Sequence, residues 1–187
     1  MRDSDAIALG QDVRGLRKSR GVTLNELALR IRRSVGFLSQ VERGISSPSI
    51  NDLRAIATAL DVPTSWFFVH EGSGEHERGV IVRAGSRRTF GTEEGGIVEE
   101  LLSPDLGGSF EVLRSVFAPG AEITDPIYRE TEEAGYIVSG HLDLWIDGQF
   151  YALNPGDSFR FDHKAYRWRN SGTEPAIAVW VISPPVY

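Results

Sequence analysis

A cluster of glutamates between residues 122 and 133 is the group of side chains with the clearest potential for chemistry. Glu130, Glu132 and Glu133 lie within the segment PIYRETEEAGYIVSG, and Glu122 stands just upstream. The segment could belong to an enzyme active site, line a sensing pocket, or form a charged loop. Acid–base catalysis by Glu133 would need a second base or a nucleophile at matched spacing, and none is evident. We interpret Glu130 and Glu132 as solvated loop charges.

The composition is that of an ordinary globular protein. Of the 187 residues, 41% are hydrophobic and 25% are charged, and no run of about 18 apolar residues predicts a membrane span. The N-terminal residues are too polar for the core of a secretory signal. The absence of cysteine excludes disulfides and thiolate metal sites. We therefore expect a cytoplasmic protein without a membrane partner.

Charge is distributed unevenly along the chain. Residues 1–70 hold ten Arg and Lys against seven Asp and Glu, a net charge of +3, whereas residues 71–187 hold ten against nineteen, a net charge of −9. Only the first part of the chain is suited to face the phosphates of a nucleic acid.

The hydrophobic pattern divides the chain into two domains. Apolar residues follow a helical period before residue 70, and strands of period two such as HLDLWID and AIAVWVI follow residue 80. The Gly-rich segment between them reads as a linker. We predict a two-domain α+β protein, with an all-α domain of about five helices over 1–69, a linker over 70–79 and an all-β domain over 80–187.

Local signals mark where the helices of the first domain begin and end. Thr23 with Glu26 and Ser49 with Asp52 have the spacing of capping boxes, and Ser34 is a third candidate N-cap. Glycine favours the left-handed conformation that ends a helix, and Gly44 stands where the helix over residues 35–43 should end.

Residues 9–68 resemble the Xre-type helix-turn-helix domains. The resemblance is carried by the stretch FLSQVERG and by the pattern SPS…L…IA.AL.V that follows it. It implies that Val35 to Arg43 form the recognition helix in the major groove, and that Arg17 and Glu42 pair to hold the first helix to it. The alternative is a dimerisation or partner-binding module with a solvated polar face.

Contacts to DNA follow from which side of that helix faces outward. Leu38 and Val41 must pack inward, which leaves four residues to meet base edges: Val35, Gly36, Ser39 and Gln40. Gln40 is the sharpest candidate because an amide can pair with adenine through two hydrogen bonds. Phosphate contacts are expected from Thr23, Arg43, Ser47 and Ser49.

The turn before the recognition helix departs from the family pattern. Arg32 and Arg33 stand where a glycine and an apolar residue are usual. A non-glycine residue in a left-handed turn costs about 1 kcal/mol. The two arginines could compensate by touching phosphate, or they could be solvated surface charges.

The second domain resembles a cupin, a double-stranded β-barrel, over residues 80–187. The frame Gly120, Glu133 and Gly140 fits the spacing of the first cupin motif. The three places that the family gives to metal-binding histidines hold Pro126, Tyr128 and Tyr166. Neutral tyrosine is a poor ligand and proline has no donor atom, so we predict no metal and no cofactor. A relocated metal site using His141 or His163 is the alternative.

The resemblance also implies which side chains point into the barrel. We expect an aromatic-lined site for a small effector, with an amine or amino acid favoured because Glu133 and aromatic rings attract cations. The candidate ligand-binding residues are Arg114, Tyr128, Glu133, Phe159, Phe161, Tyr166 and Trp168. Arg114 or Arg167 could instead pair with Glu133. The other reading is that aromatic side chains simply fill the barrel.

The joint architecture resembles the one-component regulators of which the putrescine-responsive repressor is a member. It implies a homodimer that binds a palindromic double-stranded operator and carries a small-molecule effector in the barrel. We expect a regulator and not an enzyme. The alternatives are a cupin isomerase or oxygenase with a DNA-binding appendage, and a ligand-free barrel that serves only for dimerisation.

Overall fold

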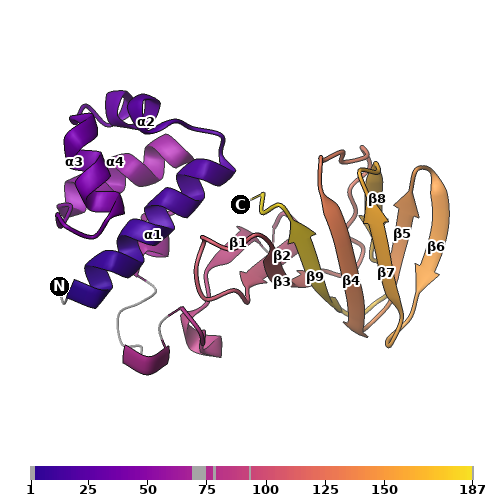
Figure 1. Ribbon diagram of the computed structural model, residues 1–187. Helices are drawn as coiled ribbons and strands as arrows, with labels where there is room; N and C mark the ends of the chain where they lie inside the picture. Colours follow the sequence, from indigo (N-terminus) through magenta and orange to yellow (C-terminus); the bar gives the residue numbers. More distant parts are fainter. Residues whose placement is uncertain (1–2, 69–74, 78, 93, 187) are drawn as a thin grey trace. The chain divides into compact units, whose positions relative to one another are not determined.

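The computed structural model describes residues 3–68, 75–77, 79–92 and 94–186. The chain divides into two compact units: Met1–Arg88 with Ser103–Ser109 and Pro185–Tyr187, and Thr89–Leu102 with Phe110–Pro184. The predicted α+β organisation, with helices first and strands second, is confirmed (Figure 1). The first unit reaches past the expected boundary at residue 79. Residues 70–74 and 78 of the expected linker lie outside the described residues.

The described residues of the first unit form four α-helices, which are followed by short 3₁₀ helices. Their bounds are α1 (Asp3–Ser19), α2 (Leu24–Arg30), α3 (Val35–Glu42), α4 (Ile50–Leu60), η1 (Thr64–Phe68), η2 (Glu75–Glu77) and η3 (Ala84–Ser86). The fifth expected helix is therefore the five-residue η1, which is too short to form an α-helix of regular length. In the described part of the chain, no helix is both long enough and apolar enough to cross a membrane.

Side-chain caps set the helix starts as predicted. The Thr23 hydroxyl accepts a hydrogen bond from the Glu26 amide while the Glu26 carboxylate accepts one from the Thr23 amide, and Ser49 with Asp52 form the same reciprocal pair. The Ser34 hydroxyl caps α3 by accepting from the amide of Phe37. These bonds satisfy amides that have no partner inside their own helix.

The core of the first unit lies between the apolar faces of its helices. Its buried members include Leu9, Val13, Leu16, Leu27, Leu38, Ile56 and Leu60. Helix α1 approaches α3 closely at Gly10, where a Cβ atom would stand only 2.4 Å from the carbonyl oxygen of Val41. The first helix therefore packs directly on the predicted recognition helix.

A buried ion pair ties later parts of the chain to α1. Asp12 accepts hydrogen bonds from the guanidinium of Arg88 and, at 3.1 Å, from the amide of Leu106. Arg88 also donates to the carbonyl oxygen of Trp66 at 3.1 Å. A Cβ atom at Gly15 would come within 2.1 Å of the Leu106 carbonyl oxygen. The loop over residues 103–109 thus packs against α1 as a part of the first unit.

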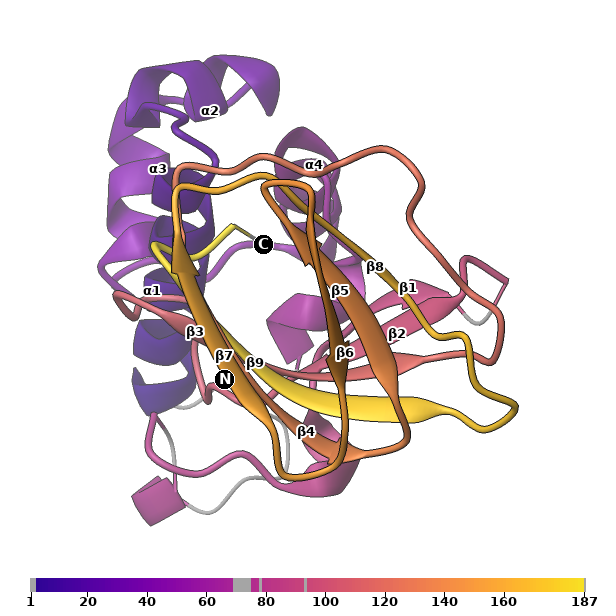
Figure 2. The same ribbon diagram turned by 90° about the vertical axis from the view of Figure 1, so that its right-hand side faces the viewer.

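The described residues of the second unit form nine strands, and every pairing between them is antiparallel. Figure 2 shows these strands curving around a common interior. They are β1 (Thr89–Thr92), β2 (Ile97–Leu101), β3 (Glu111–Phe117), β4 (Glu132–Ser139), β5 (Leu142–Ile146), β6 (Gln149–Leu153), β7 (Ser158–Asp162), β8 (Tyr166–Arg169) and β9 (Ala176–Ser183). One sheet has the order β1-β2-β3-β9-β4-β7 and the other β6-β5-β8. The segment between β3 and β4 joins the second sheet through two isolated β-bridges, from Glu122 and Ile127 to residues of β8.

Strict alternation along β3 and β9 contributes buried side chains to the barrel interior. In β3 and β9 every second residue is buried, beginning with Glu111 and Ala176, and the residues between them are half-buried. Because side chains alternate between the two faces of a strand, one face of each strand forms the core. This is the period-two pattern that the sequence predicts.

Candidate functional site

The N-terminal end of α3 presents the residues predicted to meet DNA bases. Leu38 and Val41 are buried, and Gln40 is exposed. Val35 and Gly36 are also exposed, while Ser39 is half-buried. The facing inferred from the sequence is confirmed, and the base contacts themselves stay a prediction.

The predicted ion pair between the first helix and the recognition helix is present. Arg17 Nε donates to Glu42 Oε1 at 2.6 Å and Arg17 Nη2 donates to Glu42 Oε2 at 2.9 Å. The hydrogen bond and the charge of Glu42 raise the pKa of Arg17 against the opposing effect of burial. Glu42 is therefore committed to the fold and is not available to DNA.

The two arginines of the turn have different environments. Arg32 adopts a left-handed φ of 54°, as expected for the position that usually holds glycine. Arg33 donates to Asp52 at 2.7 Å and lies 5.5 Å from the ring centre of Phe37. Arg33 thus anchors the turn to α4 and to α3 in place of the missing apolar side chain, whereas Arg32 remains a candidate for phosphate contact.

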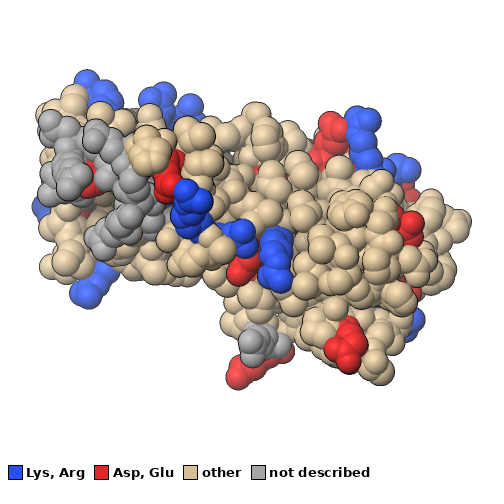
Figure 3. Space-filling view, turned by 90° about the horizontal axis from the view of Figure 1, so that it is seen from below, with Lys and Arg blue, Asp and Glu red and all other residues tan. Residues whose placement is uncertain are grey.

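The hydroxyl groups predicted to touch phosphate are engaged in capping. Thr23 Oγ1 donates to Glu26 at 2.7 Å, and Ser49 Oγ donates to Asp52 at 2.7 Å. A phosphate could receive these protons only by displacing a carboxylate. Arg43 and Ser47 are exposed. Figure 3 shows Lys and Arg side chains at several places around the rim of the helical unit, which agrees with its positive net charge.

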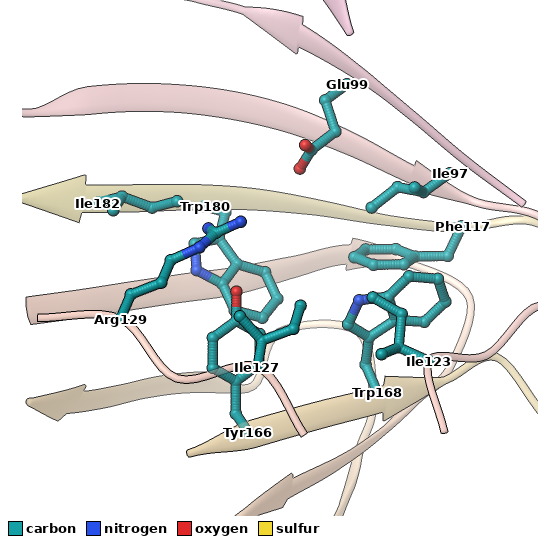
Figure 4. A pocket seen from close by; sticks show the side chains of 10 residues that line it. All are labelled: Ile97, Glu99, Phe117, Ile123, Ile127, Arg129, Tyr166, Trp168, Trp180 and Ile182. Carbon is teal, nitrogen blue, oxygen red and sulfur yellow. The ribbon is translucent and has the colours of Figure 1, made fainter. Parts of the chain in front are cut away.

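The barrel of the second unit contains a pocket of about 170 Å³ that opens to solvent on one side (Figure 4). Its lining residues are Ile97, Glu99, Phe117, Ile123, Ile127, Arg129, Tyr166, Trp168, Trp180 and Ile182. In Figure 4 the side chains of Glu99, Arg129 and Tyr166 carry the polar atoms that face the space, while Ile97, Phe117 and Trp168 gather at the other end. The pocket is thus polar at one end and apolar at the other.

Glu133 was expected among the ligand-binding residues, but it does not line this pocket, and both of its carboxylate oxygens accept hydrogen bonds. Its Oε1 accepts from Thr131 Oγ1 at 2.8 Å and its Oε2 accepts from Trp180 Nε1 at 2.7 Å. Burial, and next the negative charge of Glu133, raise the pKa of Tyr166 well above its ordinary value. Tyr166 therefore stays protonated at neutral pH and acts as a hydrogen-bond donor, not as a base.

Glu99 and Arg129 are the charged groups that line the pocket. Glu99 accepts a hydrogen bond from Ser115 Oγ at 2.7 Å, and burial raises the pKa of Glu99. The positive charge of Arg129 acts in the opposite direction, so the two groups influence each other. Among the residues that the structure describes, no hydrogen bond or ion pair joins them or engages the guanidinium of Arg129.

The structure corrects the expected placement of two candidate ligand-binding residues. Tyr128 was expected inside the barrel, but it is 61% exposed, because its loop carries it outward while the neighbouring Ile127 pairs with β8. Arg114 lies on the opposite face of β3 from the buried Ser115 and pairs with Glu100 at 3.5 Å. Neither side chain lines the pocket.

The predicted aromatic residues fall into two groups. Tyr166 and Trp168 are buried and line the pocket, as expected. Phe159 and Phe161 stack 6.0 Å apart and support the wall from behind, since Phe159 packs 4.7 Å from Trp180 and Phe161 packs 5.1 Å from Tyr166. The arginine expected beside Glu133 is also absent from that place, because Arg167 lies 3.7 Å over the ring of Trp145.

Glu99 and Arg129, the two charged residues that line the pocket, were not identified from the sequence. Trp180 could have been found, because it shares the inward parity of AIAVWVI with Ile182. Glu99 lies in a strand whose residues are half-buried on both faces, and Arg129 lies in a loop. No pattern in the sequence distinguishes them from surface charges.

The three histidine places of the cupin motif hold one proline and two tyrosines, of which Tyr128 is exposed and Tyr166 is buried. Within the described ranges, no group of three or more His, Asp or Glu side chains could hold a metal ion. His141 is exposed, and His163 is exposed and bonded to the neighbouring Asp162. The donors around Glu133 are a hydroxyl and an indole N–H, which suit a carboxylate and not a cation.

Comparisons with known proteins agree with both halves of this structure. Residues 13–67 match the helix-turn-helix family and residues 113–182 match the cupin domain family. The chain is 30% identical over 169 residues to the HTH-type transcriptional regulator SutR of Escherichia coli, covering 89% of each protein. The chain belongs to the HTH-type transcriptional regulators. The resemblance inferred from its two motifs is therefore confirmed.

Other relatives match this regulator over smaller parts. The transcriptional regulator ClgR of Mycobacterium tuberculosis is 40% identical over 76 residues, which is 41% of this chain and 68% of ClgR. A polyketide synthase, CurC of Streptomyces cyaneus, is 28% identical over 95 residues, which is 49% of this chain and 62% of CurC. The regulator is a DNA-binding protein with a cupin domain, and the role of that domain is a separate question.

Proposed function

We propose that the regulator binds a palindromic operator as a homodimer in the cytoplasm, and that a small metabolite in the barrel pocket changes its affinity for that operator. The observation that carries the sensing role is the pocket itself, with Glu99 and Arg129 facing one cavity without pairing to each other. A barrel that served only for dimerisation would have no reason to keep two such charges beside an apolar wall.

A short stretch of chain connects the pocket with the DNA-binding helices. Strand β2 carries Glu99, and the loop after it supplies Leu106, whose amide bonds to Asp12 of α1. Helix α1 in turn holds α3 through Arg17 and Glu42. In the proposal, a ligand that shifts β2 moves this loop, and so changes the preferred position of the recognition helices. The ligand must bind one of the two arrangements better than the other.

The DNA part of the proposal assigns base contacts to Val35, Gly36, Ser39 and Gln40, and phosphate contacts to Arg32, Arg43 and Ser47. Thr23, Arg33 and Ser49 join these phosphate contacts only where phosphate replaces the carboxylates of Glu26 and Asp52. Two recognition helices in a dimer would lie about 34 Å apart to reach successive major grooves. Light scattering gives the mass of the free protein, and a mass of one chain at micromolar concentration would contradict the dimer.

Binding to DNA selected from a random library tests the whole proposal. Fluorescence anisotropy should give an affinity for the selected site at least about a thousandfold above that for unrelated DNA, measured over a series of salt concentrations. Small-molecule fractions of the host cell, added to the complex, should change the affinity for the selected site. A complex that no fraction alters would leave the barrel as a scaffold and overturn the sensing role.

An enzymatic role for the barrel is tested separately. The similarity to CurC is the observation that favours it. Against it, Glu133 does not line the pocket, and Tyr166, which does, is held protonated and offers no base. Turnover of any compound that binds the pocket, followed by mass spectrometry, would establish an enzyme. We propose that bound compounds are released unchanged.

A further inference from the structure

We infer that the effector is a small apolar α-amino acid in its zwitterionic form, with its carboxylate on Arg129 and its ammonium group on Glu99. This inference rests on the proposed sensing function and specifies the ligand of that site.

The two charges of the pocket are suited to a molecule that carries both signs. Glu99 and Arg129 line the same cavity, and each acts on the charge of the other, yet no hydrogen bond or ion pair joins them in the described part of the chain. In Figure 4 the carboxylate and the guanidinium both point into the space between them. A guanidinium binds a carboxylate through two parallel hydrogen bonds, and a carboxylate that lacks solvent gains most from a cation.

Glu133 does not compete for the ligand. It already accepts hydrogen bonds from Thr131 and Trp180, and it lies next to the phenol of Tyr166. A diamine would need a second free carboxylate, and a dicarboxylate would need a second free cation. Among the described residues that line the cavity, Glu99 is the one carrying a carboxylate and Arg129 is the one carrying a positive charge.

Size and polarity restrict the rest of the ligand. A pocket of about 170 Å³ is close to an engineered cavity of about 150 Å³ that holds benzene, so it suits a ligand of on the order of six to nine non-hydrogen atoms. Away from the charged end the wall consists of Ile97, Phe117, Ile123 and Trp168. A side chain the size of that of alanine, valine or leucine fits this end, and a charged side chain would be left without a partner.

Calorimetry with three matched probes tests the inference on the full-length protein. L-Valine carries both charges, isobutylamine is valine without its carboxylate, and isovalerate is valine without its ammonium group. We expect L-valine, or its neighbours in size L-alanine and L-leucine, to bind at least about tenfold more tightly than either single-charge probe. If valine and either single-charge probe bind with equal affinity, the inference that the effector binds as a zwitterion is wrong.

Variants assign each charge to its residue. In Arg129→Gln the affinity for L-valine should fall about tenfold or more while that for isobutylamine stays, and in Glu99→Gln the affinity for isovalerate should stay. Arg129→Lys, which keeps the charge, should recover part of the binding and shows that the fold is intact. Arg114→Gln is the matched control, because that arginine pairs with Glu100 on the other face of β3. A loss of valine binding in this control as large as in Arg129→Gln would overturn the assignment.

The outcome also separates this inference from the function beneath it. One outcome is that 1,4-diaminobutane or succinate binds and alters operator affinity, while the amino acids do not bind at 10 mM, which is on the order of the weakest specific affinities. The proposed ligand class would then be wrong, and the proposed sensing function would stand. If no probe binds and no cell fraction alters operator binding, both are wrong.

Discussion

Arg17 and Glu42 meet across 25 positions of the sequence in a two-pronged ion pair that fastens the first helix to the recognition helix. The side chains are only 11% and 6% exposed. A carboxylate left in such a place without its partner is far more costly than the pair itself is valuable.

Replacing Arg17 by Met should therefore lower the free energy of unfolding of the helical unit by about 3 kcal/mol. The double variant with Glu42→Met should lose clearly less than the sum of the two single variants, because it leaves no unpaired charge. Urea unfolding followed by circular dichroism measures both. Arg33→Met is the control, since Arg33 is 51% exposed and its pair with Asp52 should contribute about 1 kcal/mol or less. Additive losses in the double variant would contradict the coupling.

Replacing Gln40 by Ala should reduce affinity for the selected operator by about 1–3 kcal/mol and leave affinity for unrelated DNA unchanged, because an amide reads a base edge. Gln149→Ala on β6, also an exposed amide, is the control. Anisotropy titrations at several salt concentrations should give parallel lines for Gln40→Ala and the native protein. An equal loss of affinity for both DNAs would show that Gln40 contacts the sugar–phosphate backbone of the DNA and not a base.

Replacing Arg32 by Gly separates strain from phosphate contact. Its φ of 54° costs a side chain about 1 kcal/mol, so the glycine variant should be more stable by up to that amount. If Arg32 touches phosphate, the same variant binds all DNA more weakly and the slope of log affinity against log salt falls by about one. Greater stability with an unchanged slope would make Arg32 a solvated charge.

Replacing Glu99 by Gln should stabilise the ligand-free barrel at neutral pH. Burial raises the pKa of Glu99 above its ordinary value of 4.5, so the folded barrel holds a proton more tightly than the unfolded chain does. That contribution is present below pH 4.5 and is lost as the pH rises through the raised pKa. The advantage of the Gln variant should thus appear above pH 4.5 and grow toward neutrality. Denaturation followed by tryptophan fluorescence at several pH values measures it, with the exposed Glu130→Gln as control; equal gains at every pH would refute the assignment.

Replacing Trp180 by Phe removes one of the two donors that hold Glu133. The cost should be about 2 kcal/mol of barrel stability, because a buried carboxylate then lacks a hydrogen bond. In the background Glu133→Gln the same change should cost less. Thermal unfolding of the four proteins gives the coupling, and equal costs in both backgrounds would show that Trp180 acts only by packing.

Local signals predicted the helical unit well because each acts over a few residues. The caps at Thr23, Ser34 and Ser49 depend on the immediate neighbours in the sequence. The left-handed turn at Arg32 was expected from the family resemblance. The pairing of Arg17 with Glu42 came from the family resemblance, since 25 positions lie between them.

The pocket was predicted only in part because its polar groups depend on how distant strands are combined. The cupin resemblance placed Tyr166 correctly, and the parity of its strand then placed Trp168. Tyr128, expected inside from the same resemblance, lies in a loop and turns outward. Glu99 becomes a candidate ligand-binding group only because Arg129, from a different part of the barrel, lines the same pocket. A charge at a strand or loop position has no sequence mark that reveals what it will face.

The attachment of Asp12 to Arg88 and to the amide of Leu106 affects how such a gene could be rearranged. A recombination that joined residues 1–69 to another sensor domain would leave a fully buried carboxylate without the arginine that neutralises it. An exchange that keeps the helical unit intact must carry Arg88 and the loop 103–109 along, although β1 and β2 lie between them in the chain. A single recombination point in the gene therefore cannot exchange the sensor domain of this regulator and leave the helical unit intact.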